Sequence, residues 1–174
     1  MSTFRSATVH NIPKITSLYD RCKVNMIAAG ILQWGDWGDG YPSATFVTQS
    51  IARGEMYCLV EGDTVQAVVA LNDQASAEWR DVDWTIAGEH PLIIHALAVD
   101  PDLQGRGIGH RALSAIERLA RELDRDVIHL DCYPGNQGAV KLYSSNGYRS
   151  CGTVHFDSKP AGCREYLCFE KAVE

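Results

Sequence analysis

The hydrophobic and polar positions of this chain follow two different periods. A continuous apolar run over residues 92–99 predicts a buried strand. After a short glycine-rich segment, apolar residues recur at helical spacing and predict a long helix ending near Asp124; they are Ile108, Ala112, Leu113, Ile116, Leu119, Ala120 and Leu123. Strand and helix patterns continue to alternate along the chain, which favours an α/β fold.

The same periods predict the remaining elements. A helix should begin at Asn11, with Pro13 just inside its start, and end near Gly30; its apolar face carries Ile15, Leu18, Tyr19, Cys22 and Met26. Ser43 can cap a second helix to about Arg53, and Asn136 a third that stops at Asn146-Gly147. Further strands are expected over residues 4–9, 56–60, 64–71, 127–133, 148–156 and 164–170.

Two connections differ from the short loops between the other elements. Residues 32–41 contain a tandem of Trp-Gly-Asp and too many glycines for a regular element. Residues 72–90 are polar and acidic around Trp79 and Trp84, and connections of this length are uncommon unless they are functional or disordered.

Length and composition limit the class of protein. At 174 residues a single domain over residues 1–174 is expected, large enough for a hydrophobic core. A net charge of −6 argues against nucleic acid as the main partner. No apolar stretch is long enough to span a bilayer, so no membrane partner and a cytoplasmic location are expected. The six cysteines show no metal-binding spacing and are expected to be buried, reduced thiols.

The segment Gln104-Gly105-Arg106-Gly107-Ile108-Gly109 opens the long helix. Its glycines remove Cβ atoms where a backbone must approach a ligand closely, and the unpaired amides of a helix start favour anions. The segment therefore predicts an anion site, suited to phosphate. A dinucleotide-binding fingerprint over Gly107, Gly109 and Ala112, with Asp131 as the ribose acid, is an alternative. Its first glycine should lie close behind the strand, and too little chain follows Asp131 for the remaining units of that fold.

Gln104-x-x-Gly107-x-Gly109 resembles the loop of the GCN5-related N-acetyltransferases, the GNAT superfamily, that binds the pyrophosphate of acetyl-coenzyme A. Residues 95–99 are similar to the fourth strand of that family, especially in arylalkylamine N-acetyltransferases. Residues 136–148 resemble the asparagine of that family, the helix that follows it and the family's Leu-Tyr…Gly-Tyr/Phe ending. The resemblance extends from about residue 91 to 150.

This resemblance implies a fold and a reaction. The fold is a mixed, mostly antiparallel sheet of about seven strands, splayed at its centre and flanked by about four helices. The reaction is transfer of acetyl from acetyl-coenzyme A to a primary amine by direct attack, with no metal. The pantetheine arm in this family pairs with the backbone of the fourth strand. The implied coenzyme contacts are Leu97, Ala98, Val99, Gln104, Gly105, Arg106, Gly107, Ile108, Gly109, Asn136, Ala139 and Tyr143.

Two side chains are candidates for proton transfer. Strand periodicity puts His95 on the face of Leu97 and Val99, where an imidazole with a pKa of about 6.5 could take the amine proton. The arylalkylamine enzymes carry two histidines here; His95 matches one and Ile93 replaces the other. A satisfied core histidine is the alternative, and Glu55, Glu78 and Asp131 are weaker candidate bases. By resemblance, Tyr143 lies beside the sulfur and protonates the leaving thiolate; the alternative is a core aromatic residue.

The connection between the first two helices commonly covers the acceptor side in this family. Here Trp34, Asp36, Trp37 and Tyr41 would receive a small cationic amine, through indole faces and a carboxylate; the alternative is a structural loop. An N-terminus or lysine of a protein is a second candidate acceptor, and a non-catalytic acyl-coenzyme A binding module is a third reading. The sequence leaves a homodimer open. His129-x-Asp131 lacks a third metal ligand, and no other catalytic motif is present.

Overall fold

Strand β4 (Pro91–Val99) and helix α3 (Ile108–Glu122) each begin in one compact unit of the chain and end in the other. The computed structural model describes residues 1–34 and 40–174. Unit 1 comprises residues 1–71 and 95–112, and unit 2 comprises residues 72–94 and 113–174. The seven strands are hydrogen-bonded in the order β1-β2-β3-β4-β5-β7-β6. The predicted mixed, mostly antiparallel seven-stranded sheet with four α-helices is confirmed; the single domain stays a prediction.

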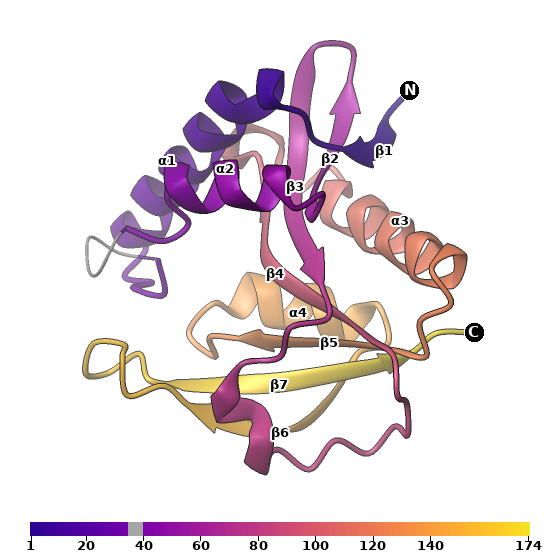
Figure 1. Ribbon diagram of the computed structural model, residues 1–174. Helices are drawn as coiled ribbons and strands as arrows, with labels where there is room; N and C mark the ends of the chain where they lie inside the picture. Colours follow the sequence, from indigo (N-terminus) through magenta and orange to yellow (C-terminus); the bar gives the residue numbers. More distant parts are fainter. Residues whose placement is uncertain (35–39) are drawn as a thin grey trace. The chain divides into compact units, whose positions relative to one another are not determined.

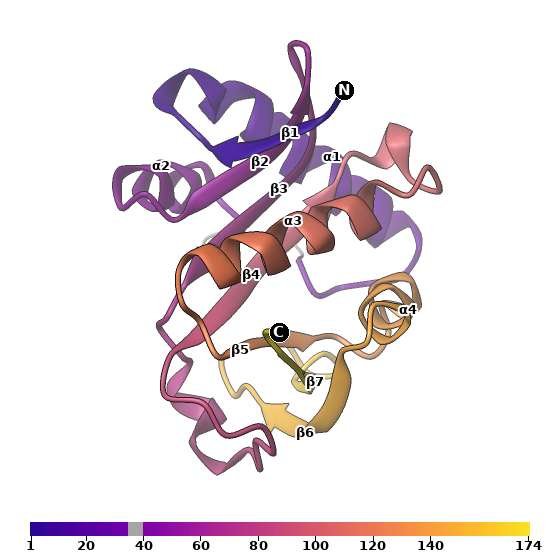
Figure 2. The ribbon, with the colours of Figure 1, turned by 90° about the vertical axis from the view of Figure 1, so that its right-hand side faces the viewer.

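Unit 1 contains the N-terminal strands and two helices. Its elements are β1 (Thr3–Ser6), the 3-10 helix η1 (Val9–Asn11), α1 (Ile12–Ala28), α2 (Ala44–Ala52), β2 (Met56–Glu61), β3 (Thr64–Asn72) and the 3-10 helix η3 (Pro101–Leu103). Strand β2 pairs antiparallel with both β1 and β3. Helices α1 and α2 cover one face of these strands and the first turns of α3 cover the other (Figures 1 and 2).

The two faces of unit 1 follow from the alternation of side chains along its strands. Cys58 of β2 packs in the cluster that contains Ile15 and Leu18 of α1. Its neighbour Leu59 points the other way and packs with Ile108 at the start of α3. Both faces are therefore apolar and covered by helices.

Unit 2 contains the C-terminal strands. Its elements are the 3-10 helix η2 (Ala77–Asp81), β5 (Val127–Cys132), α4 (Gln137–Ser145), β6 (Arg149–His155) and β7 (Glu165–Ala172). Strand β7 lies between β5 and β6 and is antiparallel to both (Figure 1). The parallel ladder between β4 and β5 joins residues 91–93 to residues 127–129, a short part of both strands.

Two local expectations need correction. The strand expected over residues 4–9 ends at Ser6, because Thr8 and Asn11 form a capping box around η1 and turn the chain into a helix. Asn11 thus hydrogen-bonds Thr8 and makes no side-chain cap to α1, although Pro13 occupies its first turn as expected. Ser43 and Asn136 cap their helices as predicted, accepting hydrogen bonds from the backbone N–H groups of Phe46 and Ala139.

The long connection over residues 72–90 is packed against the sheet of unit 2. The Trp79 side chain is buried within an apolar cluster that includes Val154 and Tyr166. Further along, the buried carboxylate of Glu170 on β7 accepts hydrogen bonds from the backbone N–H groups of Thr85 and Ile86, at 3.0 and 3.1 Å. Buried polar groups on the sheet therefore fix the course of this connection.

All six cysteines are free and five of them are buried. Burial raises the pKa of the Cys22 and Cys58 thiols to about 12, so these groups stay protonated at neutral pH. Over residues 1–34 and 40–174, no helix has the length and hydropathy needed to cross a membrane.

Candidate active site

The glycine segment forms a loop between η3 and α3. Gly105 and Gly107 have φ angles of 76° and 72°, in the left-handed region that side chains disfavour. A Cβ at Gly105 would meet open space, and a Cβ at Gly107 would have only the flexible Arg111 side chain nearby, at 3.7 Å. Helix α3 begins at Ile108, so its first amides adjoin this loop. The left-handed glycines and the adjoining helix start are the features on which the predicted anion site rests, and the site itself stays a prediction.

The turn before the loop is fixed by one ion pair. The Arg21 guanidinium donates to both oxygens of the buried Asp100 carboxylate, at 2.7 and 2.9 Å. This hydrogen bonding lowers the pKa of Asp100 and outweighs the opposing effect of burial. Asp100 also accepts from the Asp102 backbone N–H, which caps η3, and its own N–H donates to the Gln66 carbonyl of β3. The entry to the loop is therefore tied to α1 and to β3.

Strand β4 is irregular just before this turn. Ala96 has a φ of 51°, so the backbone leaves the extended conformation between His95 and Leu97. Beyond it, Leu97 and Val99 pack toward α3, whereas Ala98 packs toward α1. Strand periodicity places His95 on the same face as Leu97 only in a regular strand. Ala96 interrupts that regularity. The sequence pattern gives no signal for this residue.

His95 is half-buried in unit 1. Burial lowers its pKa from the ordinary value near 6.5, while the nearby Glu55 carboxylate opposes the shift. The imidazole is accordingly neutral at pH 7, the form that can accept a proton. Its role as a base stays a prediction.

Tyr143 lies on helix α4 in unit 2. Its side chain is buried against the rings of Tyr148 and Phe169, with centroid separations of 5.8 and 5.9 Å. Burial, together with the nearby Cys132, raises the pKa of the phenol well above its ordinary value of about 10. The hydroxyl is thus protonated at every physiological pH. One turn or more before it, Asn136 caps the same helix through Ala139, so a structural role for Asn136 is evident and a coenzyme contact stays a prediction.

The described ends of the predicted acceptor loop are anchored to the core of unit 1. The Trp34 ring packs edge-on against Tyr19, with centroids 5.7 Å apart, and joins the α1 cluster. The Tyr41 ring packs edge-on against Phe46 of α2 at 4.8 Å. The other two predicted acceptor residues, Asp36 and Trp37, lie outside the described residues.

The polar residues of β5 have partners on the long connection. The indole N–H of Trp79 donates to Asp131 at 3.1 Å, and burial raises the pKa of that carboxyl. The His129 ring stacks on Trp84, with centroids 3.8 Å apart. These contacts support a structural role for His129 and Asp131. In the part of the chain that the structure describes, no three His, Cys, Asp or Glu side chains are grouped to hold a metal ion.

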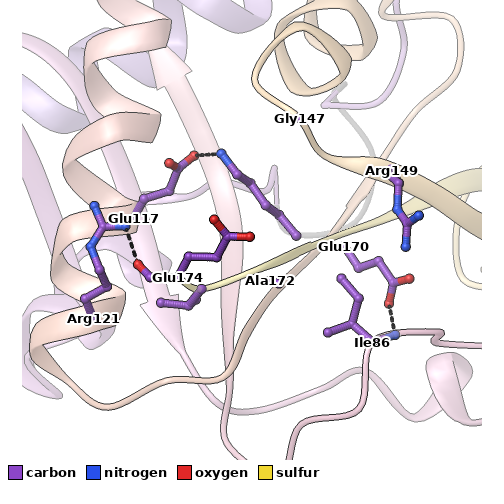
Figure 3. Close-up of a pocket in the computed structure, with 10 residues that line it drawn as sticks. Ile86, Glu117, Arg121, Gly147, Arg149, Glu170, Ala172 and Glu174 are labelled. Atoms are coloured by element: carbon purple, nitrogen blue, oxygen red, sulfur yellow. Dashed lines mark hydrogen bonds and ion pairs between the residues drawn. The ribbon is translucent and has the colours of Figure 1, made fainter.

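A cavity of about 410 Å³ lies in unit 2 under the C-terminal part of α3 (Figure 3). Lys171 bonds to Glu117 at 2.8 Å across one side, and Arg121 donates to the Glu174 carbonyl at 3.1 Å. Charged side chains of both signs line it, and none of the predicted site residues does; the lining is Ile86, Glu117, Arg121, Gly147, Arg149, Glu170, Lys171, Ala172, Val173 and Glu174.

One side chain that the sequence did not assign to the site hydrogen-bonds to the backbone of β4, next to the predicted coenzyme-contacting residue Leu97. Tyr19 of α1 was assigned only to the apolar face of its helix. Its hydroxyl donates to the carbonyl oxygen of Ala96 at 2.8 Å. A core tyrosine at helical spacing carries no sequence signal for the partner of its hydroxyl.

Comparisons with known proteins identify the family and the fold. The sequence model described as the acetyltransferase (GNAT) family matches residues 14–148. N-alpha-acetyltransferase RimI of Mycobacterium tuberculosis is 39% identical over 59 residues, which are 34% of this chain and 35% of that protein. The chain thus spans about a third of the length of this curated relative.

Two solved structures share the fold. A GNAT-family acetyltransferase from Streptococcus agalactiae is similar with a TM-score of 0.84 and 21% identity, over 99% of this chain and 96% of that one. A putative acetyltransferase from Salmonella typhimurium, solved with its cofactor acetyl-CoA, is similar with a TM-score of 0.69 and 18% identity, over 99% and 94% of the two chains. At these identities the likeness concerns the fold.

Proposed function

This chain belongs to the acetyltransferase (GNAT) family, and we propose that it transfers the acetyl group of acetyl-coenzyme A to the nitrogen of a primary amine. It is therefore an acyltransferase that uses acetyl-coenzyme A. The observation that carries the proposal is the loop at the start of α3, where Gly105 and Gly107 adopt left-handed conformations beside the first turn of the helix. Such a loop suits the pyrophosphate of the coenzyme.

The coenzyme contacts form three groups in this proposal. Residues 104–109 bind the pyrophosphate through backbone N–H groups, and Arg106 adds a positive charge. The backbone of residues 97–99 pairs with the pantetheine arm in the manner of an added strand. The half-buried Leu97 and Val99 side chains pack in the core, which leaves main-chain groups for this task. Asn136 and Ala139 complete the proposed set.

The reaction needs one base and one acid. The amine nitrogen attacks the thioester carbonyl, and its surplus proton passes to the neutral imidazole of His95. The tetrahedral intermediate then breaks its carbon–sulfur bond, and the Tyr143 phenol gives its proton to the departing thiolate. No covalent bond to the enzyme forms. The pKa directions give the resting protonation states that these roles need, because burial keeps His95 unprotonated and Tyr143 protonated.

We propose a small cationic amine as the acceptor. Trp34 and Tyr41, both anchored to the core of unit 1, flank the segment that carries Asp36 and Trp37. Aromatic faces hold ammonium groups by roughly 0.5–2 kcal/mol per contact, and a carboxylate supplies the opposite charge. The local likeness to an N-alpha-acetyltransferase favours a second candidate, the α-amine of a protein N-terminus.

An acceptor panel tests the proposed activity. Release of free thiol from acetyl-coenzyme A should rise above background with small cationic amines and stay at background with peptides bearing a free α-amine. The reverse pattern would establish the second candidate. If acetyl-coenzyme A binds in calorimetry and no amine is acetylated, the chain is an acyl-coenzyme A binding module.

Substituting Gly107 tests the coenzyme loop. Gly107→Ala places a Cβ beside the pyrophosphate and strains a φ of 72°. We expect the dissociation constant of acetyl-coenzyme A, measured by calorimetry, to rise at least about tenfold. Gly62→Ala is the matched control, since Gly62 has a φ of 57° with open space around its Cβ and lies in the β2–β3 hairpin. Equal effects of both substitutions would reject the loop as the phosphate site.

Removing the Tyr143 hydroxyl tests the acid. Tyr143→Phe should lower kcat by about 10²–10⁴-fold, because the thiolate would leave without a proton, while acetyl-coenzyme A affinity changes little. Tyr148→Phe is the control, since its buried hydroxyl has no hydrogen-bond partner among the described residues and its ring adjoins Tyr143. Wild-type kcat in Tyr143→Phe would assign this residue to the core.

The pH profile of kcat/KM tests the base. With His95 as base, the rate should fall as pH drops through a pKa below 6.5, where the imidazole becomes protonated. His95→Gln should move this acid limb to higher pH, because the amine must then lose its proton to solvent. Glu55→Gln should move it to lower pH, because the Glu55 charge raises the pKa of His95. Profiles that coincide for all three proteins would exclude His95.

A further inference from the structure

Tyr19 is a fully buried residue of α1 with a polar contact to β4. Its relative exposure is 0%, and its hydroxyl donates to the carbonyl oxygen of Ala96 at 2.8 Å. Burial raises the pKa of this phenol well above its ordinary value, with smaller effects from Tyr41 and nearby cysteines. The hydroxyl is therefore a permanent donor, and its acceptor is one particular peptide group of the strand.

That peptide group belongs to a strained residue. Ala96 has a φ of 51°, which costs a residue with a Cβ more than it costs glycine. Such a conformation persists only where the surroundings determine it. The conformation of Ala96 turns its carbonyl toward α1, and the Tyr19 hydroxyl donates a hydrogen bond to that carbonyl.

The direction of one carbonyl fixes the direction of the next amide. The Ala96–Leu97 peptide is trans, since the cis bond of the described chain is Tyr41–Pro42. In a planar trans peptide the C=O and N–H groups point in opposite directions. The Leu97 N–H therefore points away from the Tyr19 hydroxyl. Leu97 is the first residue of the segment that, in the proposed function, pairs with the pantetheine arm.

We propose that Tyr19 is a positioning residue for acetyl transfer, which orients the Leu97 N–H toward the carbonyl oxygen of the bound thioester. The inference rests on the proposed function. The Leu97 amide then donates to the oxygen on which negative charge develops, and Tyr19 acts only through the Ala96 peptide. Preorganised donors of this kind lower the barrier because they need no reorganisation during the reaction.

Two neighbouring contacts hold the strand without sharing this role. The Cys22 thiol lies 3.4 Å from the Val99 carbonyl, and Arg21 holds Asp100. The Asp100 N–H, which is the amide opposite the Val99 carbonyl, already donates to Gln66 of β3. These contacts hold Val99 at the end of β4 and Asp100 after it, whereas the Tyr19 hydroxyl bonds to the strained residue Ala96.

Tyr19→Phe removes the hydrogen bond and keeps the ring. We expect kcat to fall by about 10- to 100-fold, somewhat less than for loss of an oxyanion donor, with KM for the amine nearly unchanged. We also expect the ratio of the dissociation constants of coenzyme A and acetyl-coenzyme A to fall by about threefold or more, because only the acetyl carbonyl meets the Leu97 amide. Tyr166→Phe, which removes a buried hydroxyl with no partner among the described residues, should change neither quantity.

A second substitution tests the route through Ala96. Glycine adopts a φ near 51° without strain, so Ala96→Gly in the Tyr19→Phe background should restore part of kcat and of the binding ratio. The inference is overturned if Tyr19→Phe lowers only the melting temperature, or if Ala96→Gly restores nothing. The binding ratio does not require turnover. A protein that fails the amine panel but loses its preference for acetyl-coenzyme A in Tyr19→Phe would refute the proposed activity, while Tyr19 would still orient the Leu97 amide toward the bound acetyl group.

Discussion

Hydrogen bonds from α1 to the backbone of β4 and to Asp100, which follows that strand, are the constraint on which the proposed coenzyme loop depends. Tyr19 bonds to the Ala96 carbonyl and Cys22 to the Val99 carbonyl, while Arg21 pairs with Asp100. Tyr19 and Cys22 are three residues apart on a helix, so both face the strand. Residues 101–109 continue directly from Asp100, so the contacts of α1 with Val99 and Asp100 determine where this loop begins. A surface ion pair would contribute little, but the Asp100 carboxylate is buried and satisfied.

In unit 2 the buried polar groups organise a segment that has little regular structure. Glu170 is 1% exposed, and leaving such a carboxylate unpaired would cost several kcal/mol. It is paired by Thr85 and Ile86, and Asp131 is paired by Trp79. The long connection is thus held where the sheet needs hydrogen-bond donors.

Burial prepares both groups of the proposed proton transfer by one physical effect. Desolvation disfavours the charged form of any side chain. For a histidine that form is protonated, so burial leaves His95 able to accept a proton. For a tyrosine it is deprotonated, so burial leaves Tyr143 able to give one. Burial of each residue within its own unit is thus the main cause of both pKa shifts, and a charged partner is not the main cause for either residue.

The sequence by itself determined the features that short stretches of chain control. The glycine loop, the caps at Ser43 and Asn136 and the amphipathic helices depend on residues a few positions apart, so periodicity and turn chemistry could predict them. Only the tertiary structure decided that Ala96 leaves the strand conformation, because its carbonyl partner Tyr19 is 77 residues away in the chain. The same holds for the bond between Thr85 and Glu170, 85 residues apart. A local sequence pattern indicates which groups are buried. The packing of distant elements decides which hydrogen-bond partners offset the free-energy cost of burying their polar atoms.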